Sequence, residues 1–110
     1  MSEILSEDYM RTNVNKVNWH DVSYQQKLDE SFIREFQDEV EWNSISFNQT
    51  LSENFIREFQ DKVNWEYISI KRKLSSKFIL EFIDKLNINY ILEYQALDQE
   101  TREYLLLLKN

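Results

Sequence analysis

Carboxylates recur at a fixed spacing in this 110-residue chain. The heptapeptide FIREFQD occupies residues 32–38 and 55–61, and a degenerate copy, FILEFID, follows at 78–84, so the period is 23 residues. This period generates a glutamate column and an aspartate column: Glu35, Glu58 and Glu81, and Asp38, Asp61 and Asp84. Repeated acids on one surface would attract a basic protein or imitate nucleic-acid phosphates. We take these six residues as candidate partner-binding residues.

The aspartate column also has a structural interpretation. It is expected in the last turn of a helix, where the helix dipole disfavours an anion. Each aspartate could accept hydrogen bonds from backbone N–H groups that enter the next helix, since the chain has no glycine for its turns. Side-chain capping of turns is common, so the pattern favours this role while leaving partner binding open.

Catalysis has few residues available. His20 is the only histidine and there is no cysteine, so a Ser-His-Asp triad, a thiolate nucleophile and a multi-histidine zinc site are all excluded within one chain. The absence of glycine excludes glycine-rich phosphate loops. Acid–base catalysis by carboxylates alone remains, but a catalytic pair has no reason to be periodic. The sequence therefore predicts no enzyme activity, no metal and no cofactor.

The net charge limits the classes of partner that the chain could bind. The formal charge is -7, which disfavours direct nucleic-acid or anionic-membrane binding and favours a basic protein. The one basic cluster, KRKLSSK at 71–77, is too small for unaided duplex binding. The longest apolar run, YLLLL at 104–108, is too short to span a bilayer, and the acidic N-terminus does not resemble a secretory signal. We expect a soluble, cytoplasmic protein.

The second helix of each repeat carries the glutamate column. Residues that favour helix N-caps begin it in every copy: Ser6, Asp29, Ser52, Ser75 and Asp98. In the central copy Phe55, Ile56 and Phe59 follow at helical spacing and predict a buried stripe. On the exposed side, Glu53 with Arg57 and Glu58 with Lys62 predict ion pairs four residues apart.

A shorter first helix lies between these segments. Trp19, Trp42 and Trp65 share one column, and an aliphatic residue and then a serine follow three and four residues later, as in Ile45 and Ser46. These offsets describe one helix face, so the tryptophans are predicted to lie in equivalent, substantially buried core sites rather than to stack on a ligand. The expected N-caps of this helix are asparagines, at Asn18, Asn64 and Asn87. Glu41 occupies the same position in the remaining copy and breaks the pattern.

A 23-residue helix hairpin cannot bury its own aromatic face, so it must stack on its neighbours. The sequence predicts an all-α, solenoid-like fold built from short helical hairpins. The phenylalanine columns decay at both ends, as expected of capping segments exposed to water. We expect one domain, 1–110, with an N-terminal cap helix at 1–16, repeats at about 17–39, 40–62 and 63–85, and a C-terminal cap at 86–110. The expected helix-pair spans are 19–39, 42–62 and 65–85, after a lone helix at 6–16 and before helices at 88–96 and 98–108.

The repeat also resembles a known pattern. The motif W-x-x-[IV]-S-x-x-Q-x-L-[SD]-x-x-F-I-x-x-F is carried by Trp42, Ile45, Ser46, Gln49, Leu51, Ser52, Phe55, Ile56 and Phe59. It resembles tandem short-helix repeats in uncharacterised proteins of phages and large DNA viruses. The third repeat departs from it at Arg72, in the glutamine position, and at Leu80, in the arginine position. The resemblance implies a viral origin, and with it an inhibitor of host defence such as an anti-CRISPR protein.

Two functions fit these observations. The first is a non-enzymatic interaction module that uses its acidic surface to bind and inhibit a basic protein, such as a host complex that handles nucleic acid. The alternative is a self-associating structural protein that uses the apolar segment YLLLLKN at 104–110, or an exposed edge of the repeat array, to build a dimer or filament. Monomer and weak homodimer are both open. An enzyme and a nucleic-acid reader acting through 71–77 are less favoured.

Overall fold

The computed structural model describes residues 4–71 and 73–109, and within them every regular element is helical. The elements are α1 (Glu7–Thr12), the 3₁₀ helix η1 (Val14–Lys16), α2 (Trp19–Gln25), α3 (Glu30–Glu35), α4 (Trp42–Asn48), α5 (Glu53–Glu58), α6 (Trp65–Lys71), α7 (Ser76–Glu81), α8 (Ile88–Tyr94) and α9 (Gln99–Lys109). This order confirms the predicted all-α repeat.

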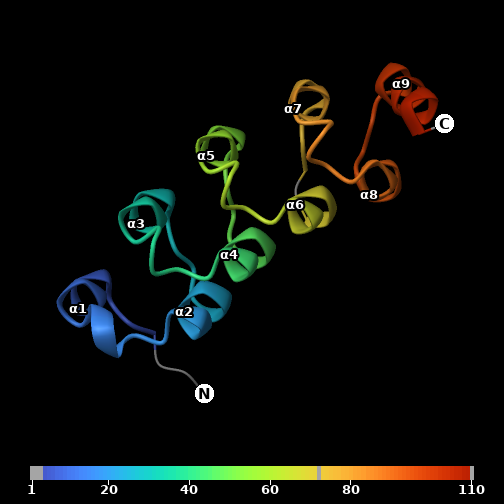
Figure 1. Cartoon of the computed structure of the whole chain (residues 1–110). Coiled ribbons are helices and arrows are strands. Elements are labelled where there is room, and N and C mark those ends of the chain that lie inside the picture. Colours follow the sequence, from blue (N-terminus) through green and yellow to red (C-terminus); the bar gives the residue numbers. More distant parts are fainter. Residues whose placement is uncertain (1–3, 72, 110) are drawn as a thin grey trace.

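The helices form two rows (Figure 1). The chain alternates between row A, which contains α2, α4, α6 and α8, and row B, which contains α1, α3, α5, α7 and α9. The molecule extends 51 × 27 × 19 Å, with its N-terminus and C-terminus at opposite ends of the rows. Each repeat therefore adds one helix to each row, which is the solenoid that the 23-residue period predicts.

All five predicted row B caps are formed. Ser52 Oγ accepts from the backbone N–H of Phe55 at 3.1 Å, and the other members of the column do the same for their own helices. Row A is capped by the expected asparagines, as in the 3.2 Å bond from Tyr67 N to Asn64 Oδ1. Glu41, which breaks the sequence pattern, caps α4 by accepting from Asn43 N at 2.9 Å. These caps fix where each helix starts.

The row B helices α1, α3, α5 and α7 are shorter than predicted, whereas α9 has the predicted length. α5 ends at Glu58 rather than near residue 62, and backbone bonds from Lys62 N and Val63 N to Phe59 O close the turn that follows. Phe59 has φ −108° and ψ 31°, and no described residue has a positive φ. The turns thus need no glycine because they avoid the left-handed region.

This turn corrects the role expected of the aspartate column. Asp38, Asp61 and Asp84 lie beyond the helices rather than in their last turns. Among the described residues, no backbone N–H donates to any of the three side chains, because the turn is closed by backbone bonds and Asn or Glu side chains cap row A. The aspartates are therefore not turn caps.

The core runs between the rows. Phe55 and Ile56 are at most 1% exposed, and their equivalents in the neighbouring repeats are equally buried. The three tryptophans occupy equivalent sites as predicted, although each is only partly buried against the core. The ring of Trp42 in row A packs at a tilt against that of Phe59, the C-cap of α5, at a centroid distance of 5.2 Å, and its Nε1 donates to Gln37 O at 2.9 Å. Each tryptophan therefore joins the two rows within one repeat.

Buried polar side chains join successive row A helices. Ser46 is fully buried; its Oγ donates to Trp42 O at 2.8 Å and accepts from Asn64 N, in the next repeat, at 2.8 Å. The equivalent serines accept in the same way from Glu41 N and Asn87 N. The small serine predicted at this packing position thus also supplies a hydrogen bond between repeats.

The glutamine column makes a second buried link. Gln49 is 3% exposed; its Oε1 accepts from Leu28 N at 2.8 Å, while its Nε2 donates to Gln26 O at 2.7 Å. Gln95 reaches back in the same way, with its Oε1 accepting from Leu74 N at 3.0 Å. The corresponding third-repeat residue, Arg72, lies outside the described residues. The glutamine of the repeat motif is therefore a bridge to the backbone of the preceding repeat.

Candidate interaction surfaces

The glutamate column lies on row B, and each member is held by an arginine from the preceding repeat. Arg34 donates two hydrogen bonds to Glu58, from Nε to Oε2 at 2.9 Å and from Nη2 to Oε1 at 2.8 Å. The same fork joins Arg11 to Glu35 and Arg57 to Glu81. Paired bonds of this kind fix the orientation of both groups. The three carboxylates therefore form part of the contact between repeats.

Each arginine also covers an aromatic ring. The guanidinium carbon of Arg34 lies 5.5 Å from the ring centroid of Phe55, and the two equivalent distances are 5.8 Å and 5.5 Å. The hydrogen bonds from the arginines lower the pKa of Glu35, Glu58 and Glu81. Arginine, glutamate and phenylalanine thus form a recurring triad between neighbouring row B helices.

These triads replace the ion pairs expected along single helices. Arg57 pairs with Glu81 of the next repeat rather than with Glu53. Glu53 instead accepts from the backbone N and Oγ of Ser75, at 2.8 and 2.9 Å. Glu58 is paired with an arginine rather than with Lys62. The charged side chains therefore connect repeats, because neighbouring helices offer forked geometry that a single helix surface does not.

The aspartate column is more exposed. Asp38 is 89% exposed and lies 3.2 Å from Lys62 Nζ. Asp61 and Asp84 are exposed and make no ion pair with any other described residue. The two predicted columns thus differ: the glutamates are neutralised locally, whereas two of the aspartates remain open to a partner.

Row A presents a different surface, which the sequence analysis missed. The described residues that line a hollow of about 340 Å³ are Tyr24, Phe47 and Tyr67 together with polar residues such as His20, Glu41 and Asn43. Phe47 and Tyr67 meet edge to face at 5.0 Å, and Tyr90 and Tyr94 at 6.1 Å. Their positions repeat: Tyr24 aligns with Phe47, and Tyr67 with Tyr90, at the 23-residue spacing. We call these five rings the aromatic face.

Carboxylates accompany the aromatic face. Glu66 and Glu93 are exposed on the same helices as Tyr67 and Tyr90. Glu66 accepts from Asn87 Nδ2 at 3.2 Å, and neither glutamate forms an ion pair with a described residue. This surface thus combines rings and carboxylates. The repeated Tyr and Phe columns were the sequence signal for it.

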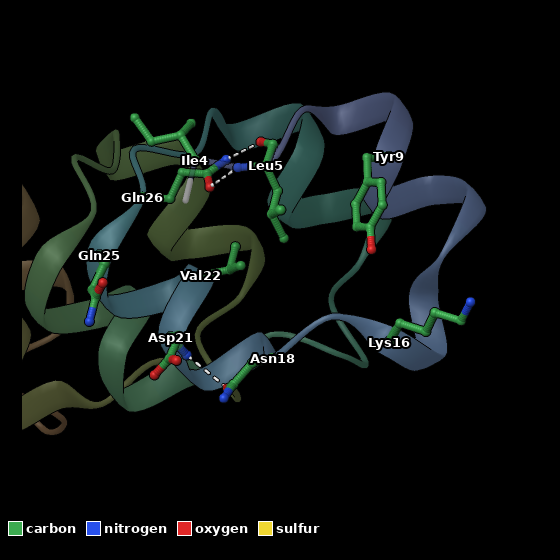
Figure 2. A pocket seen from close by; sticks show the side chains of 9 residues that line it. All are labelled: Ile4, Leu5, Tyr9, Lys16, Asn18, Asp21, Val22, Gln25 and Gln26. Atoms are coloured by element: carbon green, nitrogen blue, oxygen red, sulfur yellow. Dashed lines mark hydrogen bonds between the residues drawn. The ribbon is translucent and has the colours of Figure 1, made fainter. Parts of the chain in front are cut away.

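The N-terminal end of row A contains a second hollow, of about 310 Å³ (Figure 2). It lies between the start of the chain and α2, where row A has no preceding helix in the described structure. Gln26 closes on Leu5 there: its Nε2 donates to Leu5 O at 2.6 Å and its Oε1 accepts from Leu5 N at 2.9 Å. Both polar ends of Gln26 are thus satisfied without a further helix.

The C-terminal end interrupts the triads. At the next repeat, the arginine position of the triad is occupied by Leu80, the glutamate position by Tyr104 and the phenylalanine position by Thr101. These residues line a hollow of about 550 Å³. Leu80 is 42% exposed, Tyr104 49% and Leu107 74%. The terminal helix α9 is therefore apolar on part of its outer surface.

Other chemistry finds little support in the described residues. No group of His, Cys, Asp or Glu among them is arranged to hold a metal ion. None of their helices is both long and apolar enough to cross a membrane. In the basic cluster at 71–77, Arg72 and the side chain of Lys71 lie outside the described structure. Comparisons of the chain with protein-family models, curated proteins and solved structures give no match, so they do not support the resemblance to viral repeat proteins.

Proposed function

We propose that this chain is a non-enzymatic protein-interaction module that binds a basic protein. The supporting observation is where its negative charge remains. The chain has 20 acidic and 13 basic residues, and three of its arginines are each paired with one glutamate between repeats. The surplus of acid therefore lies outside the triads, and it is distributed over an elongated molecule whose longest dimension is 51 Å. Such a surface attracts basic partners and accelerates their association.

The aspartate column gives the clearest test of the residues predicted to bind the partner. Asp61 and Asp84 are exposed and hold no described cation, so replacing them changes charge without removing an ion pair. Replacing the column glutamates by lysines would reverse their charge, but it would also deprive the arginines of their ion-pair partners and so lower stability. We expect a partner captured from the native lysate to bind the Asp61→Asn/Asp84→Asn variant more weakly, with slower association and a smaller dependence on salt. Affinity that responds neither to these changes nor to raised salt would contradict an acidic binding surface.

Inhibition is the expected consequence of such binding. A partner that normally holds nucleic acid has a basic surface, and an acidic solenoid that covers this surface would compete with the nucleic acid. A viral inhibitor of host defence, as the resemblance implies, is the most specific form of this proposal. The identity of the captured protein tests it: a partner without nucleic-acid-binding activity would remove the competitive mechanism.

Self-association is a second candidate, supported by the exposed apolar side chains of α9. Tyr104, Leu107 and Leu108 are 44–74% exposed, and the two leucines follow Tyr104 by three and four residues on one helix. Exposed apolar patches of this kind mark contact surfaces in many proteins. Light scattering over a concentration series should then show a rising mass that Leu107→Gln abolishes. A constant monomer mass would exclude this alternative.

A further inference from the structure

The last junction of row B, between α7 and α9, differs from the three before it in size as well as in charge. At the triad position, Thr101 replaces a phenylalanine and Leu80 replaces an arginine. Both side chains are smaller than those they replace, and a hollow of about 550 Å³ lies at this point. Leu80 and Tyr104 are uncharged, so they cannot form the ion pair that joins the earlier helices. This junction thus has an apolar recess where its predecessors have a filled triad.

The hollow continues into an apolar stripe on α9. Tyr104, Leu107 and Leu108 follow Glu100, which also lines the hollow, by four, seven and eight residues, so these side chains share one face of the helix. Leu107 is the most exposed of them, at 74%. An apolar stripe with a recess at one end suits an amphipathic helix, whose own apolar residues recur at the same spacing.

The charge beside this stripe is mainly negative. Glu100 and Glu103 are exposed on α9. Of the two basic residues in the helix, Arg102 donates to Leu92 O of α8 at 3.3 Å, and Lys109 lies at the opposite end from Glu100. A second copy of the chain would bring the same acids and a formal charge of -7, so like charges oppose that pairing. The charge therefore favours a basic segment as the occupant.

We propose that the hollow and the apolar stripe of α9 bind an amphipathic basic helix of the partner. Apolar side chains of that helix pack against Leu80, Tyr104 and Leu107, and its lysines or arginines lie beside Glu100 and Glu103. This inference rests on the proposed function and adds the form of the partner and the surface that anchors it. The acidic surface accelerates the encounter, and the apolar contact holds the complex.

The test uses three synthetic peptides. The first carries a leucine stripe at helical spacing flanked by lysines; the second has the same composition in scrambled order; the third keeps the stripe but replaces the lysines by glutamates. Binding to the full chain is measured by calorimetry, and the contact surface is mapped by backbone amide chemical shifts. We expect the first peptide to bind about tenfold more tightly than either of the others, with the largest shifts in α7 and α9.

Two variants locate the contact. Leu107→Gln should weaken binding of the first peptide by about tenfold, the effect of losing one buried leucine contact. Its matched control is Ile4→Gln, which changes an 85% exposed aliphatic side chain near the opposite end of the molecule and should leave the affinity unchanged. Leu80→Arg/Tyr104→Glu restores the charged pair of the earlier junctions without changing the net charge. It should weaken binding as strongly while the helical signal is retained.

Equal affinity for the ordered and scrambled peptides, shifts centred outside α7 and α9, affinity that neither variant lowers, or no binding would each overturn the inference. A mass that rises with concentration and returns to the monomer value with Leu107→Gln would overturn it too, because a second copy would then occupy the stripe. The proposed function is judged separately, on the captured natural partner. A partner whose binding depends on salt and on Asp61 and Asp84 but not on Leu107 would sustain the function and reject this surface.

Discussion

Row A and row B are stacked by different forces, although one repeat generates both. In row A, neighbouring helices pack closely and are linked by buried serine and glutamine side chains that bond to backbone groups. In row B, exposed arginines reach from one helix to the glutamate and phenylalanine of the next. Buried hydrogen bonds are costly to leave unmade, whereas surface ion pairs contribute little and are screened by salt. Row A should therefore set stability, and row B should make it depend on solution conditions.

The largest effect is expected where the two rows meet. Phe55 is 1% exposed, stacks near Trp42 of row A and lies beneath Arg34 of row B. Phe55→Ala should destabilise the fold by about 3–5 kcal/mol, the usual cost of emptying a close-packed phenylalanine site. The control is Asn13→Ala, at the eroded N-terminal end, where the side chain donates to Tyr9 O and Thr12 Oγ1 within its own turn. Similar urea midpoints for the two variants would contradict the importance of the central stack.

The next effect tests row A alone. Gln49→Leu keeps a side chain of similar size but removes the acceptor for Leu28 N and the donor to Gln26 O. The first of these hydrogen bonds is buried and the second is partly buried. Each backbone group left without a partner should cost about 1–3 kcal/mol. Gln25→Leu, on an exposed position, is the matched control. The loss measured by urea unfolding should be the same at low and high salt, because no charge is involved; a loss that vanishes with salt would place the link at the surface instead.

Local patterns in the sequence were sufficient to predict the elements and their starting points. The cap columns and the spacing of Phe55 with Ile56 depend on neighbouring residues within one helix, so the predictions were confirmed at every cap. The ends of the row B helices were predicted too late, except for that of α9. Lys62 and Val63 continue the apolar and charged pattern, but both donate to Phe59 O in a turn, and nothing in their side chains marks this change.

The contacts between repeats were harder to predict because they depend on stacking geometry. Glu58 has a lysine four residues later in sequence, yet its partner is Arg34, 24 residues earlier. A periodic column shows that a residue recurs, but it does not show whether the side chain meets solvent or the neighbouring repeat. The glutamate column therefore seemed available to a partner, whereas its carboxylates are held by arginines. The rings of the aromatic face were visible as columns but carried no signal that separated surface from core.

The smallest effect concerns row B and its response to acid. The arginine hydrogen bonds lower the pKa of Glu35, Glu58 and Glu81 in the folded protein. As pH falls, the unfolded chain therefore binds protons at these glutamates before the folded chain does. Their contribution is fully present above the ordinary glutamate pKa of about 4.3, and it is lost as pH falls through the lower folded values. We expect the melting temperature to decline over this acidic range, and the contribution of the pairs to weaken in high salt.

Replacing the three glutamates by glutamine isolates this contribution. The Glu35→Gln/Glu58→Gln/Glu81→Gln variant should melt slightly below the parent near neutral pH and should lose less of its melting temperature on acidification. Some decline should persist, because backbone bonds at the caps also lower the pKa of Asp29 and Asp98. The row A variant Gln49→Leu should retain the full acid dependence of the parent. If the triple variant and the parent declined in parallel, the triads would not be the source of the acid response, and the division between a conditional row B and an unconditional row A would fail.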